Sequence, residues 1–465
     1  MLKIFNDLTQ RKEEFIPLEE NMVKMYVCGP TVYDDCHIGH ARSFIVFDVI
    51  RRYLEFKGFK VIYITNFTDI DDKMIKRANE EKTTIFNLAE KYINSYFEDC
   101  DKLNIKRATE YPRATELIDE MIKINEILIK KKNAYISEGN VYFNISSFPN
   151  YAKLSNVNLE ETRSSENDIK KKNPHDFALW KAKKNDEPSW SSPWGQGRPG
   201  WHIECSAMSQ KYLGDTIDIH GGGRDLIFPH HENEIAQSEA YTGKQFVRYW
   251  IHNGFVTINK EKMSKSLGNF FTIKDVIKKY KPETIRYFLI SSHYRNPIDY
   301  SEENLIQADR TYRRFNNTII LIKQLIDSKM KIQKDSDQFK HLLKITKDKF
   351  IEAMDDDFNT PKALSELSEL IKYINKLESQ EEVPSLLELK QAQSLLNEIG
   401  DVLGILPNDT ISDELLNNLI ELTVEIRNEL REIKRFELSD KIRDKLKELG
   451  IQLTDSKTST SWKFI

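Results

Sequence analysis

Cysteines, long apolar runs and excess charge are all scarce in this sequence. Its 465 residues include only four cysteines, at positions 28, 36, 100 and 205. So few cysteines cannot form a disulfide framework in a chain of this length, which indicates a reducing compartment. No apolar run approaches the roughly 18 residues that a membrane span needs. The N-terminal MLKIFNDLTQRKEEF lacks the apolar core of a secretory signal. We therefore expect a cytoplasmic protein without a membrane association.

The charge balance is close to neutral, with 69 Lys and Arg against 73 Asp and Glu. Bulk charge therefore gives no support for nucleic-acid binding, and any such binding must come from local patches. The length exceeds what one hydrophobic core usually supports, so we expect roughly two to four domains.

The first part of the chain has the pattern of a parallel α/β sheet. Residues 22–29 (MVKMYVCG) and 60–67 (KVIYITNF) are predicted to be buried strands. Between them, apolar residues at helical spacing predict a helix over 41–57 that ends at Gly58. Strand, helix and strand in this order form a βαβ unit and imply a parallel sheet.

The rest of the chain interrupts this pattern and then becomes helical. Residues 75–130 are predicted to be helical, and 134–200, rich in aromatics, Pro and Gly, to be an irregular insertion. Strand patterns return at 216–220 and 249–258. Periodicity after residue 302 predicts helices up to about Leu403, with Gly404 as a helix stop. A small helical unit with a strand-like tail completes the chain.

Five of the ten histidines lie between residues 202 and 252. In FPHHENE (228–234), His230 and Glu234 are four residues apart, so on a helix they share one face and can hold one metal. His231-Glu232 begins like the HExxH of zinc proteases, but Ile235 stands where the second histidine is needed, so that interpretation fails.

Two cysteines can complete a metal site with this pair. Cys205 lies in GWHIECSAM, and Cys28 ends the first strand, where ligand sites of parallel sheets occur. Two thiolates, an imidazole and a carboxylate suit zinc. Spacing alone leaves two alternatives open: ordinary surface and core residues, or a purely structural zinc. Ligands from three distant segments favour a functional site over a structural one.

Two short motifs indicate nucleotide chemistry. Residues 37–40 spell HIGH at the start of the predicted helix, where a helix N-terminus and two histidines can bind phosphate. Residues 262–266 spell KMSKS, and Lys262 and Lys265 can hold the β- and γ-phosphates of ATP. Each motif alone is weak, because the first is also an ordinary helix cap and the second an ordinary surface loop. Together they predict class I aminoacyl-tRNA synthetase ancestry.

A glycine run lies between the two motifs, in HGGGRDL (220–226). Gly222 gives room for a planar base or a ribose, and Asp225 can accept hydrogen bonds from ribose hydroxyls. Glycine runs are more often turns, so this assignment depends on the other motifs.

The chain resembles the cysteinyl-tRNA synthetase family over essentially its whole length. The segments that carry the resemblance are MYVCGPTVYDDCHIGHAR, TNFTDIDDKMIKRA, RPGWHIECSAM, HGGGRDLIFPHHENEIAQSEA and EKMSKSLGNFFTI. The resemblance implies a Rossmann-type α/β catalytic domain with an inserted connective domain, then a helical bundle and a small C-terminal anticodon-binding domain. The expected divisions are 1–74 and 201–260 for the catalytic halves, 75–200 for the insertion, 261–305 for the KMSKS and stem-contact region, 306–404 for the bundle and 405–465 for the C-terminal domain.

The resemblance also implies the activity. We expect the chain to activate L-cysteine with ATP and Mg²⁺, releasing pyrophosphate, and to load it onto tRNA(Cys), as a monomer. The substrate thiolate would join a zinc ion, which prefers sulfur to the hydroxyl of serine, so that no editing domain is needed.

The implied site residues fall into four sets. The zinc ligands would be Cys28, Cys205, His230 and Glu234, with His202 and His231 around them. The cysteine pocket would be lined by Gly29, Thr68 and Trp201. The ATP and catalytic set would be His37, Gly39, His40, Gly222, Asp225, Lys262 and Lys265. Anticodon contacts would be Arg431, Phe436, Asp440 and Asp455, although Phe436 stands where the family can show Trp, and all four also fit an ordinary helix surface.

Three rival functions remain in view. A cysteine ligase with a small-molecule acceptor would share the activation step but would need no C-terminal anticodon module, and this chain has one. A catalytically silent RNA-binding paralogue should have lost part of HIGH, KMSKS or the zinc set, and none is missing. A simple nucleotidyltransferase would account for HIGH but not for the zinc set and KMSKS together.

Overall fold

The computed structural model describes residues 1–161, 170–185, 187–263, 269–327, 332–406, 413–455 and 460–464. These residues form two compact units, Met1–Leu406 and Pro407–Ile465. Among the described helices, none combines the length and the apolar character needed to cross a membrane.

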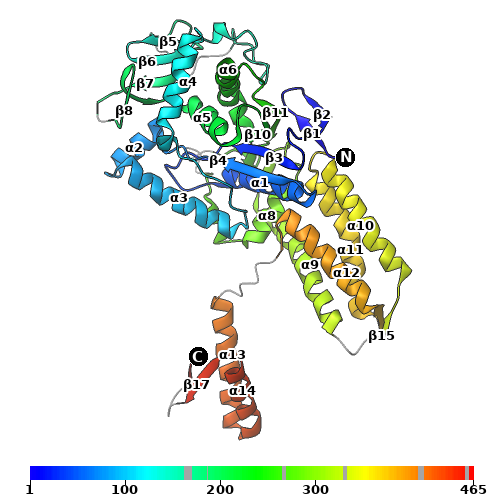
Figure 1. Cartoon of the computed structure of the whole chain (residues 1–465). Coiled ribbons are helices and arrows are strands. Elements are labelled where there is room, and N and C mark those ends of the chain that lie inside the picture. The colour runs from blue at the N-terminus through cyan, green and yellow to red at the C-terminus, as the bar shows by residue number, and fades with distance from the viewer. Residues whose placement is uncertain are drawn as a thin grey trace. The chain divides into compact units, whose positions relative to one another are not determined.

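A four-stranded parallel sheet forms the centre of the first unit (Figure 1). Its order is β11 (Val247–Asn253), β10 (Ile217–Gly223), β3 (Met22–Val27) and β4 (Lys60–Thr65). The strands are buried along most of their length, since helices cover the sheet. The predicted parallel α/β sheet is confirmed.

Helix α1 (Ile38–Phe56) connects β3 to β4 and packs against β4 and β11. Since β4 lies on one side of β3 and β10 on the other, the chain order reverses between β3 and β10. Such a switch point, outside the carboxyl ends of the strands, is where open α/β sheets bind ligands.

The described part of the insertion contains three α-helices and a sheet. The helices are α2 (Asp72–Glu80), α3 (Ile85–Lys102) and α4 (Ile118–Lys130). The prediction that 134–200 is irregular was wrong, because an antiparallel five-stranded sheet lies there, in the order β5 (Ala134–Ser137), β6 (Asn140–Phe143), β7 (Phe177–Ala182), β9 (Gly195–Pro199) and β8 (Trp190–Ser192). These strands are too short for a clear alternation of apolar and polar residues.

Two helices complete the layer beside the sheet, α5 (Trp201–Leu213) and α6 (Glu232–Thr242), and α5 packs against β3 and β4. Residues 224–231 form two short helical turns between β10 and α6. At the N-terminus, β1 (Lys3–Asn6) and β2 (Arg11–Glu14) form a hairpin, and β1 packs beside β11.

The remainder of the first unit begins with a small sheet and two short helices. The sheet has the order β13 (Glu261–Lys262), β12 (Val256–Ile258) and β14 (Ile298–Tyr300), with α7 (Ile273–Ile277) and α8 (Pro282–Ile290) between β13 and β14 in sequence.

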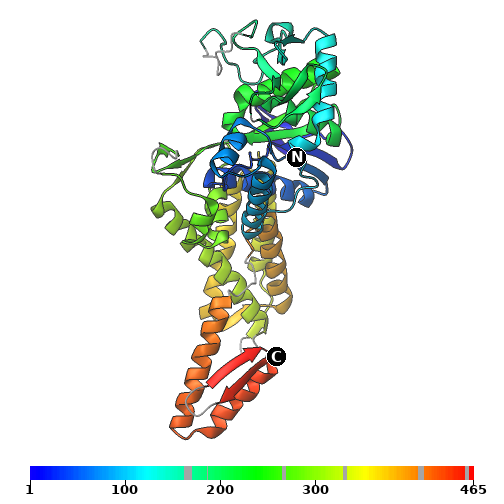
Figure 2. The ribbon, with the colours of Figure 1, turned by 90° about the vertical axis from the view of Figure 1, so that its left-hand side faces the viewer.

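A helical bundle follows, and both views show its helices side by side (Figures 1 and 2). It consists of α9 (Glu302–Asp327), α10 (Asp337–Asp355), α11 (Thr360–Lys376) and α12 (Leu386–Leu403), with a two-stranded pair, β15 (Ile332–Lys334) and β16 (Glu382–Pro384). Gly404 ends α12, as predicted, and has the left-handed conformation.

In the second unit, the described residues form two helices and a β-hairpin (Figure 2). These are α13 (Asp413–Glu432), α14 (Phe436–Glu448), β17 (Ile451–Asp455) and β18 (Thr460–Phe464). Its small core contains Ile420, Val424, Leu446 and Ile451. The predicted helical unit with a strand-like tail is confirmed.

Candidate metal and nucleotide site

The four predicted zinc ligands meet at the switch point of the sheet. Cys28 follows β3 and Cys205 lies in α5. His230 lies in the helical turn just before α6, and Glu234 lies in the first turn of α6. The two sulfur atoms are 3.7 Å apart, and the Sγ of Cys205 is 3.6 Å from Nε2 of His230. Oε1 of Glu234 is 3.6 Å from the Sγ of Cys28 and 3.0 Å from Nε2 of His230.

These separations fit a tetrahedral metal. Zinc binds sulfur at about 2.3 Å and nitrogen or oxygen at about 2.0–2.2 Å, so tetrahedral ligands lie roughly 3.3–3.8 Å from one another. The observed distances of 3.0–3.7 Å lie in or just below this range. The cluster could therefore hold a metal ion without a large rearrangement.

His231 is a further candidate ligand. Its Nε2 atom is 3.3 Å from the Sγ of Cys28 and 3.9 Å from Oε1 of Glu234. One set of metal-binding atoms that all lie within 4.8 Å of one another consists of Cys28, His230, His231 and Glu234. The described residues thus offer five candidate donors, and His231 competes with Cys205 for the fourth position.

A buried chain of hydrogen bonds determines which nitrogen of His231 carries the proton. Oδ2 of Asp7 accepts from Nδ1 of His252 at 2.8 Å, and Nε2 of His252 is 2.7 Å from Nδ1 of His231. Burial lowers the pKa of both histidines, so both are neutral. With the proton of His252 on Nδ1, its Nε2 must accept from Nδ1–H of His231. The lone pair of Nε2 of His231 therefore faces Cys28.

The electrostatics of the cluster favour a bound cation. Burial opposes ionisation of Glu234, but the adjacent His220 and His230 lower its pKa to about 2. The hydrogen bond from Cys28 lowers the pKa of Cys205 to about 6, against the effect of burial. Burial also opposes the charged form of His230, yet Glu234 and Cys205 raise its pKa to about 10. The positive charge of His230 thus balances the negative charge of Glu234 and Cys205. A bound metal ion would neutralise this negative charge instead.

The predicted cysteine-pocket residues border this cluster. The ring of Trp201 stacks on that of His230 at 4.3 Å between centroids, and Trp201 is 40% exposed, so it is not a core residue. Gly29 N–H donates to Asn66 Oδ1 at 2.9 Å. The hydroxyl of Thr68 donates to Oε2 of the buried Glu204 at 3.0 Å. The structure brings the three predicted residues together around the candidate ligands.

The HIGH motif forms the start of α1. His37 is the N-cap, and its Nδ1 accepts from the backbone N–H of His40 at 3.3 Å, while Nδ1 of His40 accepts from the backbone N–H of His37 at 3.2 Å. The two rings stack at 3.6 Å. Since both Nδ1 atoms accept, both neutral rings carry their proton on Nε2. The motif therefore presents two N–H donors, suited to phosphate oxygens.

The segments on either side of the KMSKS loop contact HIGH. Residues 264–268, which include Lys265, lie outside the described residues, as does the side chain of Lys262. Before the loop, the side chain of Met263 lies close to Gly39. After it, Phe271 O accepts from the N–H of Ile38 at 3.1 Å, and Thr272 pairs with His37 in a backbone bridge.

The glycine run has a packing role at its centre. A Cβ on Gly221 would lie 2.3 Å from Phe47 of α1, so only glycine lets the helix approach β10 this closely. Asp225 folds back toward Gly223, in the turn after β10. The adenosine-binding roles of Gly222 and Asp225 stay predictions.

The four predicted anticodon residues all lie in the second unit. Asp455 accepts two hydrogen bonds from the buried guanidinium of Arg427, at 2.9 and 2.8 Å, and lies 3.7 Å from Arg431. Asp440 pairs with Arg443 at 3.0 Å, and Phe436 is 54% exposed. Arg427 was not predicted, although it orients Asp455, which in turn lies beside Arg431.

Five other supporting residues were given no role from the sequence: Asp7, Asn66, Glu204, His220 and His252. Only the histidine clustering gave a signal, since it included His220 and His252 among the candidates. The others become neighbours of the site through the fold.

Comparison with known proteins defines the class. The sequence profile described as the tRNA synthetases class I (C) catalytic domain matches residues 14–311, and that of the DALR domain matches 349–407. A structure of Mycobacterium tuberculosis methionyl-tRNA synthetase in complex with methionyl-adenylate has a TM-score of 0.61 at 16% identity, covering 83% of this chain and 90% of that chain. A second structure of that enzyme bound by methionyl-adenylate has a TM-score of 0.59 at 15% identity, covering 82% and 90%. These similarities show the fold.

The fold and the profile place the chain among the class I aminoacyl-tRNA synthetases. A protein of Caldicellulosiruptor saccharolyticus named cysteine–tRNA ligase is 51% identical over 462 residues, which are 99% of each chain. Within class I, the chain belongs to the cysteine–tRNA ligase family.

Proposed function

We propose that this chain activates L-cysteine with ATP and transfers it to the 3′-terminal adenosine of tRNA(Cys). The first step would form cysteinyl-adenylate and pyrophosphate. The observation that carries the proposal is the position of the thiol, imidazole and carboxylate cluster beside the HIGH helix, at the switch point of the sheet. The cluster would select the sulfur of the substrate. The HIGH motif would bind the phosphates of ATP, which enters with Mg²⁺.

Zinc is the metal that the donor set favours. Cys28, Cys205, His230 and Glu234 would hold it, with His231 as the competing donor. When bound, zinc offers a soft coordination position that favours a thiolate over a hydroxyl. The chain would therefore distinguish cysteine from serine by coordination chemistry, where a pocket contact gives only modest discrimination.

The polar groups around the cluster would orient the rest of the substrate. The exposed Trp201 covers His230, and Gly29 and Thr68 are held in place by Asn66 and Glu204. These contacts support a pocket that fixes the carboxylate of cysteine for attack on the α-phosphorus of ATP. Positioning of this kind can supply a large part of the rate enhancement.

The HIGH residues would stabilise charge on the reacting phosphates. The capping bonds place the proton of His37 and His40 on Nε2. These N–H groups would donate to the phosphate oxygens on which charge builds during the displacement. Lys262 and Lys265 would bind the departing pyrophosphate. Gly39, Gly222 and Asp225 would receive the adenosine.

The second unit would recognise the RNA. Arg431, Phe436, Asp440 and Asp455 offer exposed polar and aromatic groups of the kind that bind splayed bases. We infer that the chain acts as a monomer and works in the cytoplasm, where tRNA and ATP are both present.

The test is ATP–pyrophosphate exchange without tRNA, with cysteine or serine, on metal-replete and metal-stripped protein, with zinc content measured alongside. Exchange that requires cysteine, ignores serine and disappears with the metal is the expected result. Loading of cysteine onto tRNA then identifies the acceptor. Absence of exchange in metal-replete protein would overturn the proposal.

A further inference from the structure

A buried arginine without an acidic partner lies in the second turn of the HIGH helix. Arg42 follows His40 by two residues in α1, and its side chain is fully buried. Its Nη2 atom donates to the carbonyls of Ser292 and His293, at 3.2 and 2.9 Å. Its Nε and Nη1 atoms have no hydrogen-bond partner among the described residues. The proposed chemistry gives this cation no role.

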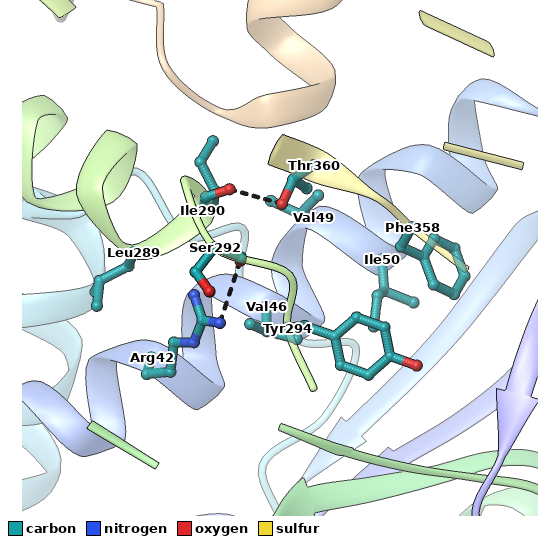
Figure 3. Close-up of a pocket in the computed structure, with 10 residues that line it drawn as sticks. All are labelled: Arg42, Val46, Val49, Ile50, Leu289, Ile290, Ser292, Tyr294, Phe358 and Thr360. Carbon is teal, nitrogen blue, oxygen red and sulfur yellow. Dashed lines mark hydrogen bonds between the residues drawn. The ribbon is translucent and has the colours of Figure 1, made fainter. Parts of the chain in front are cut away.

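The surroundings of Arg42 are mostly apolar. Arg42 lines a small cavity together with Val46, Ile50 and Leu289, and Figure 3 shows its guanidinium directed at Ser292. Burial lowers the pKa of Arg42 to about 10, so the guanidinium still carries its charge at neutral pH. A buried cation loses much of its hydration, which is costly unless an opposite charge compensates for the loss.

The acids that lie nearest in the fold are bound by other cations. Asp357, in the turn between α10 and α11, accepts from Nε of Arg295 at 2.8 Å. Further along α1, Asp48 accepts from Nε of Arg52 at 2.7 Å. Within the part of the chain that the structure describes, the bonds of Arg42 are to the two carbonyls alone. Its positive charge is therefore uncompensated there.

The helix end next to Arg42 is itself electropositive. The first turn of α1 contains no acidic residue, although acids are favoured at this end, where free N–H groups carry partial positive charge. His37 and His40 add two N–H donors. Arg42 lies about 3 Å along the axis from His40, on a helix about 10 Å across. Its guanidinium is therefore on the order of 10 Å from the phosphates that HIGH would bind.

We propose that Arg42 is the buried counter-charge of the ATP phosphates: its charge adds to the positive potential at the start of α1 and strengthens ATP binding without contact. This inference deepens the proposed function and rests on it. At about 10 Å and an effective dielectric constant of about 20, two unit charges interact strongly enough to change an equilibrium constant by roughly tenfold. Salt screens a buried charge less than an exposed one. Binding of the anionic substrate would thus offset the cost of burying Arg42.

The two carbonyl bonds allow a different explanation, in which Arg42 only holds α1 against residues 292–293. The two roles differ in the ligands that they affect. A displaced α1 would weaken the binding of charged and neutral nucleosides alike. Loss of the charge alone would weaken the binding of ATP and leave the binding of uncharged adenosine unchanged.

The experiment compares Arg42→Gln and Arg42→Lys with the unsubstituted full-length chain. Both new side chains keep a donor for the carbonyls, but only lysine keeps the charge. Ser292→Asp is a further variant, since it keeps Arg42 and gives it an acidic partner at a half-buried position. Arg51→Gln is the matched control, because Arg51 is a cation of the same helix that pairs with Glu55 at 2.8 Å.

Each protein is assayed for the KM of ATP in pyrophosphate exchange and for inhibition of exchange by adenosine, with zinc content and melting temperature measured alongside. We expect the KM for ATP to increase by roughly tenfold in Arg42→Gln and Ser292→Asp, and to stay within about threefold in Arg42→Lys and in the control. The inhibition constant of adenosine should stay within about twofold in all four variants.

Equal increases in the KM for ATP in Arg42→Gln and Arg42→Lys would overturn the inference, as would a parallel weakening of ATP and adenosine. An unchanged KM for ATP in Ser292→Asp would also overturn it. If Arg42→Gln does not fold, the Ser292→Asp variant decides, because it retains the arginine and its bonds. Absence of exchange in the unsubstituted chain would instead overturn the proposed function.

Discussion

At the scale of single residues, the orientation of the candidate metal site depends on groups that do not touch the metal position. Asp7 determines the tautomer of His252, which determines that of His231. Such outer partners keep a donor nitrogen in the correct protonation state and direction. The arrangement therefore makes Asp7 a support for the site, although it lies in the turn after β1, far away in sequence.

Replacing Asp7 with Asn should weaken metal binding. The amide can donate to His252 and allows the tautomer chain to reverse, which turns Nε2 of His231 into a donor facing Cys28. We expect metal affinity to fall by roughly 10- to 100-fold. Competition with a chromophoric chelator measures the affinity without reference to activity. Asp218→Asn is the control, because Asp218 is buried in β10 and its two oxygens accept from the backbone N–H groups of Leu18 and Lys24, away from the histidines. Equal affinities in the Asp7 variant and the control would contradict the tautomer argument.

Asp99 in α3 gives a prediction about stability and pH. Its side chain is buried and both oxygens lack a hydrogen-bond partner among the described residues. Burial raises its pKa to about 7. In the unfolded chain an aspartate has a pKa of about 3.9. The folded protein therefore holds this proton more tightly, and the stability it contributes below pH 4 is lost as the pH rises to about 7.

Asp99→Asn should remove this dependence, since the amide resembles the protonated acid. We expect the free energy of unfolding to increase by about 1–3 kcal/mol at pH 8, with no difference from the unsubstituted chain at pH 4. Urea denaturation at the two pH values measures this. Asp101→Asn, on the exposed side of the same helix, should change the free energy little at either pH. A change of equal size at both pH values would refute the assignment to ionisation.

At the scale of elements, the start of α1 combines capping with chemistry. Serine, threonine, aspartate and asparagine are the usual N-caps, yet here two histidines cap each other's backbone N–H groups. The reciprocal bonds use only the Nδ1 atoms, so the proton of each ring stays on Nε2. The predicted helix began at residue 41, but it begins at Ile38, since no preferred capping residue marks this boundary in the sequence.

His40→Ala should slow adenylate formation by roughly 10²- to 10³-fold, the usual loss for one transition-state donor. His40→Gln should lose less, since its carbonyl can cap His37 and its amide can donate outward. The initial rate of pyrophosphate exchange compares the two, with zinc content and melting temperature confirming that each variant is folded and loaded. Similar rates for the alanine variant and the unsubstituted chain would remove His40 from the proposed chemistry.

The sequence predicted long, strongly periodic or motif-bearing elements and missed elements defined by distant pairing. β3, α1, β4 and the bundle helices carry their own apolar patterns, so the parallel sheet and the bundle followed from them. The strands from β5 to β9 have only three to six residues, and β6 and β7 are separated by more than thirty residues, which hides them in the sequence. The candidate ligands stand in recognisable motifs, whereas Asp7, Asn66 and Glu204 become partners only when β1, β4 and α5 pack together.

At the scale of the whole molecule, the two proposed steps place different demands on the chain. Activation would use the first unit alone, while transfer would need the RNA contacts of the second. Asp455 links the packing of the second unit to its proposed RNA contacts. It is a predicted RNA contact, and it is also the partner of the buried Arg427. The side-chain hydrogen bond from Arg427 lowers the pKa of Asp455 to about 2, so this carboxylate stays ionised as a hydrogen-bond acceptor at neutral pH.

Arg427→Lys should therefore impair recognition of tRNA without affecting activation. Lysine keeps the charge but cannot form the two parallel bonds that orient Asp455. We expect the KM for tRNA in cysteine loading to increase by about tenfold, as for the loss of an oriented contact worth roughly 1–3 kcal/mol. Pyrophosphate exchange should stay unchanged, because its reactants bind to the first unit. Lys445→Arg is the control, since Lys445 forms an exposed pair with Glu448 that includes none of the predicted RNA contacts. A variant that loses exchange and loading together would show that the two units do not divide the reaction in this way, whereas unchanged loading would remove Asp455 from the RNA contacts.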